Sequence, residues 1–355
     1  MTASTAATVP ADDARLSALR RWLAAQPAAL GLAPDSLRPA SADASFRRYF
    51  RLDAAGGTLI AMDAPPERED SAPYVKVCAL LHDAGLKAPR IVARDLAQGF
   101  LLLTDLGGRT YLTALQADAA AADPLFNAAT DALIDWQRAS RPDVLPPYDA
   151  ALLRRELDLF PDWYVGRHLQ HTLSAAQKDT LERTFALLIA AALAQPKVYV
   201  HRDYMPRNLM LPQASEPGAG DPRPGVLDFQ DAVYGPITYD LVSLFRDAFI
   251  SWEEERALDW TVRGWEKARR AGLPVDADFG EFYRAFEWMG LQRHLKVLGI
   301  FARINYRDGK PHYLADTPRF MRYARSVSQR YAPLKPLALL LDQLEGVAVR
   351  AGYTF

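Results

Sequence analysis

The most constraining feature of this sequence is a pair of aspartates 25 residues apart, Asp203 and Asp228. Asp203 lies in a polar segment that ends at Asn208, with apolar residues at 199–200 before the segment and at 209–211 after it. Asp228 follows the apolar pair 226–227, and residues 212–224 are rich in Gly, Pro, Ser and Asp, which is typical of a solvated turn. The pattern predicts an antiparallel hairpin that sets Asn208 and Asp228 side by side on neighbouring strands.

The residue types at these positions suit one kind of chemistry. Residues 201–208 fit the pattern H-R-D-x-x-x-x-N, in which the Asp meets an attacking hydroxyl and the Asn holds Mg²⁺. Asp228 stands where the D-F-G aspartate would stand, although Gln230 replaces the glycine. We therefore predict an ATP-dependent kinase in which Asp203 is catalytic and Asn208 and Asp228 bind Mg²⁺. The alternative is that Asp203 and Asn208 are ordinary turn residues, since both types favour turns.

Length and composition agree with a two-lobed enzyme. A chain of 355 residues, half of them apolar, is too long for one small core. A net charge of −1 argues against a surface for nucleic acid, and the single cysteine, Cys78, excludes an internal disulfide and favours a reducing compartment. Residues 1–10 lack a signal-peptide pattern, and no window of eighteen apolar residues could span a membrane. We expect a cytoplasmic monomer.

Hydrophobic periodicity divides the chain into two parts. Strands with a helix among them precede Asp105, and from Tyr111 onward the pattern is mostly helical apart from the hairpin at 198–229. We predict an α+β fold, with a small antiparallel-sheet lobe over residues 1–105 and a larger, mainly helical lobe over residues 106–355. The expected elements are helices over 12–30, 74–85 and a long one centred on 288–299, and strands over 38–52, 58–62, 91–95 and 100–104.

These motifs resemble the aminoglycoside-phosphotransferase and choline-kinase group of small-molecule kinases, which share the two-lobed protein-kinase-like fold. Residues 235–241, Gly-Pro-Ile-Thr-Tyr-Asp-Leu, are similar to the group's G-D-P-x-x-D-L element, which implies that Asp240 braces the catalytic loop. The segments 41–50, 201–210, 227–252 and 292–303 are similar to the bacterial anomeric sugar kinases. That resemblance implies ATP and Mg²⁺ as cofactors. It also implies a small amino sugar as substrate, N-acetylmuramate or N-acetylglucosamine, phosphorylated at the 1-hydroxyl during peptidoglycan recycling.

The predicted nucleotide lobe departs from the protein-kinase pattern. No G-x-G-x-x-G occurs, so the candidate phosphate loop is 43–46, in which Ser45, Phe46 and backbone amides would replace the glycines. Met62 stands where the lysine of V-A-I-K is expected, so the phosphate charge must be met elsewhere. Arg48 or Arg47 is favoured as the phosphate partner over the alternative that these arginines, with Arg51, are solvated charges on an edge strand.

The adenine is expected to meet backbone groups of Thr104 and Leu106, with Ile60 as an apolar wall. The alternative is that residues 101–104 are simply a buried strand.

The acceptor candidates lie near the catalytic loop and on the long helix. They are Arg207, Gln230, Asp231, Arg293 and His294. The alternatives are a surface charge for Arg207 and a core residue for His294. An acidic-aromatic cluster of Glu156, Asp158, Asp162 and Trp163 would suit a sugar or an organic cation. The cations of the last helices, Arg293, His294, Lys296, Arg303 and Arg307, would suit the lactyl carboxylate of a muramic acid.

Two other functions stay open on the sequence alone. One keeps the chemistry and changes the acceptor to an aminoglycoside or a choline-like amine. The other is a catalytically dead nucleotide-binding module, prompted by the missing lysine and glycine loop. Intact Asp203, Asn208 and Asp228 argue against the second.

Overall fold

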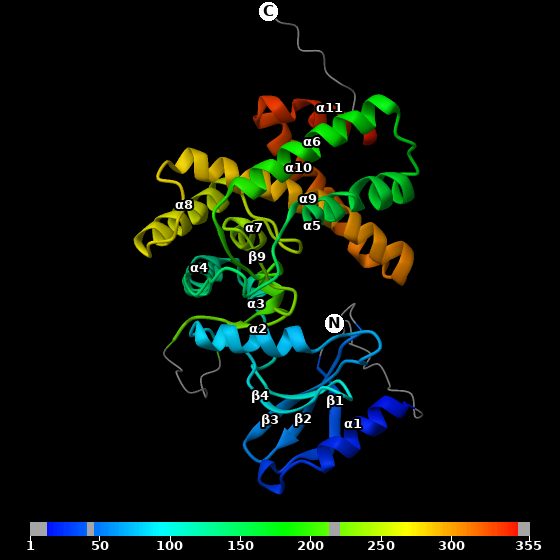
Figure 1. The fold of residues 1–355 in the computed structure, drawn as a ribbon, viewed down its shortest axis with the longest axis vertical. Coiled ribbons are helices and arrows are strands. Elements are labelled where there is room, and N and C mark those ends of the chain that lie inside the picture. The colour runs from blue at the N-terminus through cyan, green and yellow to red at the C-terminus, as the bar shows by residue number, and fades with distance from the viewer. Residues whose placement is uncertain (1–12, 41–45, 213–220, 347–355) are drawn as a thin grey trace, which may run out of the picture. The chain divides into compact units, whose positions relative to one another are not determined.

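The structure is a computed structural model that describes residues 13–40, 46–212 and 221–346 (Figure 1). The chain divides into two units, one formed by residues 1–79 and 88–107 and the other by residues 80–87 and 108–355. The first holds an antiparallel sheet of five strands and the second is mainly helical. The predicted α+β class is therefore confirmed. The expected boundary after residue 105 lies two residues before the division at 107, and the segment 80–87 counts with the second unit.

Hydrogen bonds explain why the segment 80–87 belongs to the second unit. The backbone N–H of Val226 donates to the carbonyl of Lys87 at 2.7 Å. The ammonium of Lys87 donates to the carbonyl of Asp221 at 3.0 Å. The division therefore runs through helix α2 (Ala72–Asp83), whose sequence gives no sign of an interruption.

The sheet of the first unit has the strand order β1-β2-β3-β5-β4, with every neighbouring pair antiparallel. Its strands are β1 (Ala33–Pro39), β2 (Arg48–Ala54), β3 (Gly57–Asp63), β4 (Ile91–Asp95) and β5 (Phe100–Thr104). The predicted strands 91–95 and 100–104 are confirmed. The turn between them requires glycine, because Gly99 has φ +73° and an added Cβ would lie 1.8 Å from the carbonyl oxygen of Ala64.

Two predictions for the first unit were wrong in their bounds. The helix expected over 12–30 is α1 (Ala14–Ala24) followed by a separate 3₁₀ turn at Ala28–Leu30, because Pro27 cannot continue an α-helix. The strand expected over 38–52 is the end of β1 and the start of β2. The sequence pattern does not indicate most of β1, because this strand carries two prolines, which only an edge strand tolerates.

Helix α1 lies along the sheet of the first unit (Figure 1). Its leucines are buried against one face of that sheet. Leu16, Leu19 and Leu23 follow helical spacing and are all buried. They pack in one cluster with Phe50, Leu52, Ala61, Phe100 and Leu102. Each such side chain contributes roughly 1.5–3 kcal/mol when fully buried, which fixes α1 on this face.

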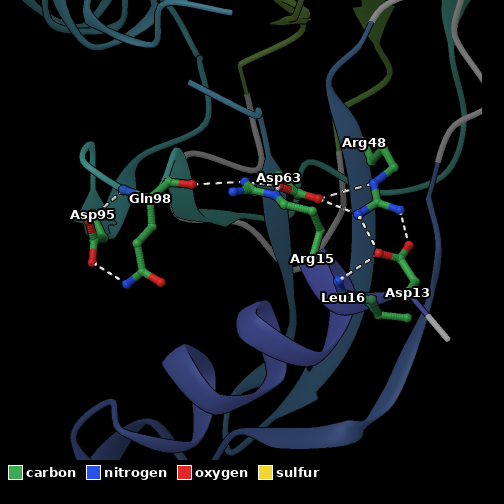
Figure 2. A network of polar contacts seen from close by, with 7 residues as sticks. All are labelled: Asp13, Arg15, Leu16, Arg48, Asp63, Asp95 and Gln98. Atoms are coloured by element: carbon green, nitrogen blue, oxygen red, sulfur yellow. Dashed lines mark hydrogen bonds and ion pairs between the residues drawn. The ribbon is translucent and has the colours of Figure 1, made fainter. Parts of the chain in front are cut away.

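A polar network lies beside this cluster (Figure 2). The carboxylate of Asp63, which has no exposed surface, pairs with both Arg15 of α1 and Arg48 of β2. Arg48 pairs in addition with Asp13, the residue that caps the N-terminus of α1. The hydrogen bond and charge of Arg48 outweigh burial and lower the pKa of Asp13. The guanidinium of Arg48 is thus held by two carboxylates, which counts against its predicted contact with a phosphate.

We expect Asp63→Ala to lower the free energy of unfolding by about 2–3 kcal/mol. The substitution leaves two arginines without their shared carboxylate. The expected loss of stability is smaller than for a fully buried ion pair, because both arginine side chains are about one-third exposed. Urea denaturation of the full chain measures it. The matched control is Asp53→Ala on β2, whose pair with Arg38 is exposed on both sides and should cost less than about 1 kcal/mol. Equal losses would show that the network does not stabilise the fold.

The second unit surrounds one long helix, α9 (Phe279–Asp308), and so confirms the prediction of a long helix centred on 288–299. Its other α-helices are α3 (Tyr111–Ala117), α4 (Ala122–Arg138), α5 (Ala150–Leu157), α6 (Ala175–Ala194), α7 (Tyr239–Phe245), α8 (Glu254–Arg270), α10 (Thr317–Arg330) and α11 (Lys335–Leu344). A π-helical segment, η3 (Phe160–His168), and the short 3₁₀ segments 119–121, 206–208, 311–316 and 332–334 complete its helical part. No helix within the described residues is long and apolar enough to cross a membrane.

The middle of helix α9 is buried on nearly all sides. Leu291, Leu295 and Leu298 pack in one core with residues of η3, α6, α10 and α11. The approach of α9 to the chain before η3 depends on Gly299, where a Cβ would lie 2.3 Å from the carbonyl carbon of Leu159. The middle of α9 is therefore a core element of the second unit.

Candidate active site

The candidate catalytic residues lie on the segments that follow or precede the strands of two short antiparallel pairs. β6 (Lys197–Val200) pairs antiparallel with β9 (Val233–Pro236), and β7 (Leu209–Met210) pairs antiparallel with β8 (Gly225–Val226). The amide nitrogen of Asn208 lies 3.3 Å from the carboxylate oxygen Oδ2 of Asp228. The predicted hairpin, with Asn208 and Asp228 side by side, is confirmed.

Asp203 lies on the loop that β6 leads into, and backbone hydrogen bonds fix it there. Its N–H donates to Nδ1 of His201 at 3.2 Å, and its carbonyl accepts from the Asn208 amide at 2.9 Å and from the Met205 N–H at 2.9 Å. Burial lowers the pKa of the His201 imidazole to about 4, so this histidine is neutral and supports the loop. The Asp203 side chain is partly exposed.

Asp228 is exposed and sits in a strained backbone conformation, with φ +63°. The amide nitrogen of Gln230 donates to its other carboxylate oxygen, Oδ1, at 2.9 Å. Among the described residues, only four besides glycine have positive φ, and two of them, Arg202 and Asp228, lie in this site. Such conformations cost about 1–3 kcal/mol each and persist where the surroundings over-determine them.

Asp240, at the start of α7, accepts hydrogen bonds from two consecutive amides of the catalytic loop. Its Oδ2 binds the N–H of His201 at 2.7 Å and its Oδ1 binds the N–H of Arg202 at 3.0 Å. Burial raises the pKa of the Asp240 carboxyl to about 7, against the opposing effect of these two donors. Asp240 thus lies where it can brace the loop, as the resemblance implied.

The donor set suits a hard divalent cation held together with phosphates. The Asn208 amide nitrogen donates to two acceptors, so its oxygen Oδ1 is the atom that would bind a cation, and Asp228 adds an exposed carboxylate. In the described part of the chain no group of three His, Cys, Asp or Glu gathers around one point. Mg²⁺ needs no such cage, because one or two protein oxygens and substrate phosphates suffice.

The acceptor candidates divide into exposed and buried residues. Asp231 is exposed, and Arg207 is partly exposed with its guanidinium 5.0 Å from the ring centre of Phe249. Both stay predictions. Gln230 is only 7% exposed and its amide nitrogen donates to Asp228, which counts against its predicted contact with a sugar.

The structure counts against the predicted roles of Arg293 and His294. His294 has no exposed surface and stacks on Tyr323 at 4.9 Å, with Phe320 at 5.6 Å. Burial lowers its pKa well below the usual value, so it is a neutral core histidine. Arg293 is 2% exposed and lies where its charge acts on the buried carboxylates of Asp240 and Asp247. This burial counts against the predicted contact of either residue with a sugar.

Several members of the predicted acidic-aromatic cluster and of the predicted cationic set are paired within the protein. Glu156 is buried, Asp158 pairs with Arg154, and Arg307 pairs with its neighbour Asp308 at the surface. Lys296 is buried and pairs with Glu156 at 2.9 Å. A signal in the sequence existed, because Glu156 falls on the apolar face of α5 beside Leu153 and Leu157, where a carboxylate needs a buried partner.

Comparison with known proteins identifies the family. Residues 36–275 match the sequence profile of the phosphotransferase enzyme family. The chain belongs to this family. It is 52% identical over 347 residues, 96% of this chain and 99% of the relative, to the N-acetylmuramate/N-acetylglucosamine kinase of Pseudomonas putida. It is 51% identical over 320 residues, 89% of this chain and 93% of the relative, to the protein of the same name from Neisseria meningitidis.

Solved structures with the same fold include other phosphotransferases. An ADP-bound aminoglycoside phosphotransferase matches 88% of this chain and 97% of its own, with a TM-score of 0.56 and 13% identity. A choline/ethanolamine kinase family protein from Mesorhizobium loti matches 93% of this chain and 99% of its own, with a TM-score of 0.57 and 16% identity. These likenesses confirm the protein-kinase-like fold.

The nucleotide candidates of this phosphotransferase lie in the first unit. Ser45 is outside the described residues. Phe46 is 55% exposed, with the guanidinium of Arg68 4.7 Å from its ring centre, and Ile60 and Leu106 are partly buried. The N–H of Thr104 already donates to the carbonyl of Arg90 at 2.9 Å, so the expected adenine contact there is limited to other groups.

Asp105 is the polar residue of this region that the sequence did not reveal. Its carboxylate accepts from the guanidinium of Arg51, from the hydroxyl of Thr58 at 2.7 Å and from the N–H of Gly107 at 2.9 Å. The partners come from β2, β3 and the chain after β5. Asp105 therefore fixes the exit from the sheet, and Arg51 is a structural partner of that residue.

Proposed function

We propose that this chain is an ATP-dependent kinase of the anomeric C1 hydroxyl of N-acetylmuramate and/or N-acetylglucosamine, acting in peptidoglycan recycling. The observation that carries the proposal is the 52% identity, along almost the whole length of both chains, to a kinase named for these two sugars. Asp203, Asn208 and Asp228, which lie close together on one loop and one hairpin, support the proposed chemistry.

In the proposed reaction the acceptor oxygen forms a bond to the γ-phosphorus of ATP while the bond to the ADP oxygen breaks. Asp203 orients the acceptor hydroxyl and takes up its proton. An anomeric hydroxyl is more acidic than an ordinary alcohol, so a carboxylate is a strong enough base. Asn208 and Asp228 would hold Mg²⁺, which when bound neutralises charge on the β- and γ-phosphates.

The remaining contacts are part of the same proposal. Arg207 and Asp231, the exposed or partly exposed candidates beside the catalytic loop, would contact the acceptor. Ser45, Phe46, Ile60, Thr104 and Leu106 would contact the nucleotide.

An ATP-consumption assay over a panel of acceptors tests the substrate class. We expect turnover with N-acetylmuramate and N-acetylglucosamine and none above background with choline, ethanolamine or aminoglycosides. Turnover confined to the amines would replace the sugar acceptor and keep the kinase chemistry. If no acceptor of the panel leads to ATP consumption, the result would favour the catalytically dead nucleotide-binding module.

The site of phosphorylation provides a separate prediction. We expect N-acetylglucosamine to give a 1-phosphate and its 1-O-methyl glycoside to give no product, because the methyl group replaces the hydroxyl that attacks. Phosphorus NMR, through the coupling of the phosphorus to the sugar protons, distinguishes attachment at C1 from attachment at C6. Coupling to the C6 protons, or efficient turnover of the methyl glycoside, would contradict the anomeric assignment.

A further inference from the structure

The side chain of Arg202, the residue before Asp203, runs into a buried cluster on α5 and α9. Its guanidinium pairs with Oε1 of Glu156 on α5. The same carboxylate oxygen lies 2.9 Å from the ammonium of Lys296 on α9. The other oxygen of Glu156 accepts from the hydroxyl of Tyr148 and from the amide of Gln292 at 3.2 Å. One carboxylate thus binds four donors, of which Tyr148 is a near neighbour in sequence and the other three come from distant parts of the chain.

The charges of this cluster keep Glu156 ionised although it is buried. Burial alone would raise the pKa of Glu156, but the charges of Lys296 and Arg202 outweigh burial and lower it to about 2. Burial opposes the charge of Lys296, and the attraction of Glu156 overcomes it, so that the pKa of Lys296 is raised. Two cations and one carboxylate leave a net positive charge, and the negative charge of Asp203 acts on both cations.

Arg202 needs this support because its backbone is strained. Its φ is +75°, which lies in the left-handed region. A residue other than glycine adopts this conformation at a cost of roughly 1–3 kcal/mol. Three groups hold it there: Asp240 binds its backbone N–H, Glu156 binds its guanidinium, and the carbonyl of Asp231 accepts a long hydrogen bond of 3.5 Å from the guanidinium. Since Asp203 is the next residue, the conformation of Arg202 sets the direction in which the Asp203 carboxylate points.

We propose that Glu156 and Lys296 are positioning residues for phosphoryl transfer, which rests on the function proposed above. Glu156 anchors Arg202 and thereby the aspartate that receives the acceptor proton. Lys296 adds a second positive charge beside Glu156, which keeps the carboxylate ionised and fixed. Neither residue touches a substrate. Their contribution is to the geometry of the reacting hydroxyl and not to the affinity for ATP or the sugar.

The test is Glu156→Gln, which keeps the size of the side chain and removes the charge that two cations share. We expect kcat to fall about 10²-fold, because a displacement of roughly 1 Å at a reacting group costs that much. KM for ATP and for the acceptor should each change less than about twofold, since ground-state binding is untouched. The matched control is Glu182→Gln. The carboxylate of Glu182 also pairs with an arginine of α5, Arg154, but it is exposed. The kcat of this control should equal that of the wild type.

A second variant covers the case in which Glu156→Gln does not fold. Lys296→Met leaves a neutral pair of Glu156 and Arg202, and we expect kcat to fall about tenfold with both KM values unchanged. Unchanged kcat in the folded variants, or a loss that lies wholly in KM, would overturn the proposal.

Hydrogen exchange separates this inference from the choice of substrate. The amides of residues 201–203 should exchange at least about tenfold faster in either variant than in the Glu182→Gln control, because the loop loses an anchor. If another acceptor is the substrate, the kcat comparison is made with that acceptor and decides as before. If the wild type transfers no phosphate, the proposed function fails, and equal exchange in variant and control would overturn the positioning role by itself.

Discussion

Asp203→Asn is expected to lower kcat by about 10²–10⁴-fold, the usual contribution of a general base. The substitution removes the proton acceptor and keeps the shape of the side chain. The hydrogen bonds that fix the loop at this position use the backbone N–H and carbonyl of residue 203, so the loop should keep its conformation. Steady-state kinetics measures kcat. Calorimetric titration of the Asp203→Asn variant with ATP should give the same affinity as the wild type has.

Asp179→Asn serves as the control for this prediction. Asp179 is exposed on α6 and pairs there with Arg183, so its loss should leave kcat unchanged. An Asp203→Asn enzyme that keeps more than half of its activity would remove Asp203 from the mechanism. A loss of ATP affinity equal to the loss of rate would instead show that the residue shapes the nucleotide site.

Asp228→Ala is expected to abolish Mg²⁺-dependent turnover, with a loss of at least about 10²-fold, because it removes the carboxylate that would hold the cation. Asn208→Ala should retain more activity and require a higher Mg²⁺ concentration, since an amide oxygen contributes a dipole and no charge. Initial rates against Mg²⁺ concentration at saturating ATP and sugar measure both effects. Calorimetric titration of Mg²⁺ with ADP gives a readout independent of turnover.

The backbone at Asp228 calls for a second variant. Asparagine tolerates the left-handed region better than alanine, so Asp228→Asn removes the charge with little added strain at φ +63°. The matched control is Asp143→Asn, because Asp143 is exposed and has nearly the same φ, +62°. Wild-type activity that persists in excess chelator, or full turnover by Asp228→Asn, would contradict the metal role.

The sequence by itself determined the features that depend on neighbouring residues. The hairpin that joins Asn208 to Asp228 follows from two short apolar runs and a turn, because strand pairing across a turn is a local event. The turn at Gly99 follows from a left-handed backbone conformation that glycine adopts without strain. The family resemblance rested on motifs of the same local kind, and the match over residues 36–275 confirmed it.

Only the tertiary structure decided which polar residues face a substrate and which face the interior. Helical spacing assigns the faces of a helix when one face meets solvent, but α9 packs on several sides, so Arg293 and His294 are enclosed. Arg48 turned to Asp13 and Asp63 because residues 35 and 15 positions away approach it in the sheet unit. Glu156 meets Lys296 across 140 positions of sequence. A buried charge needs a partner, and only folding brings a partner from so far along the chain to within hydrogen-bonding distance.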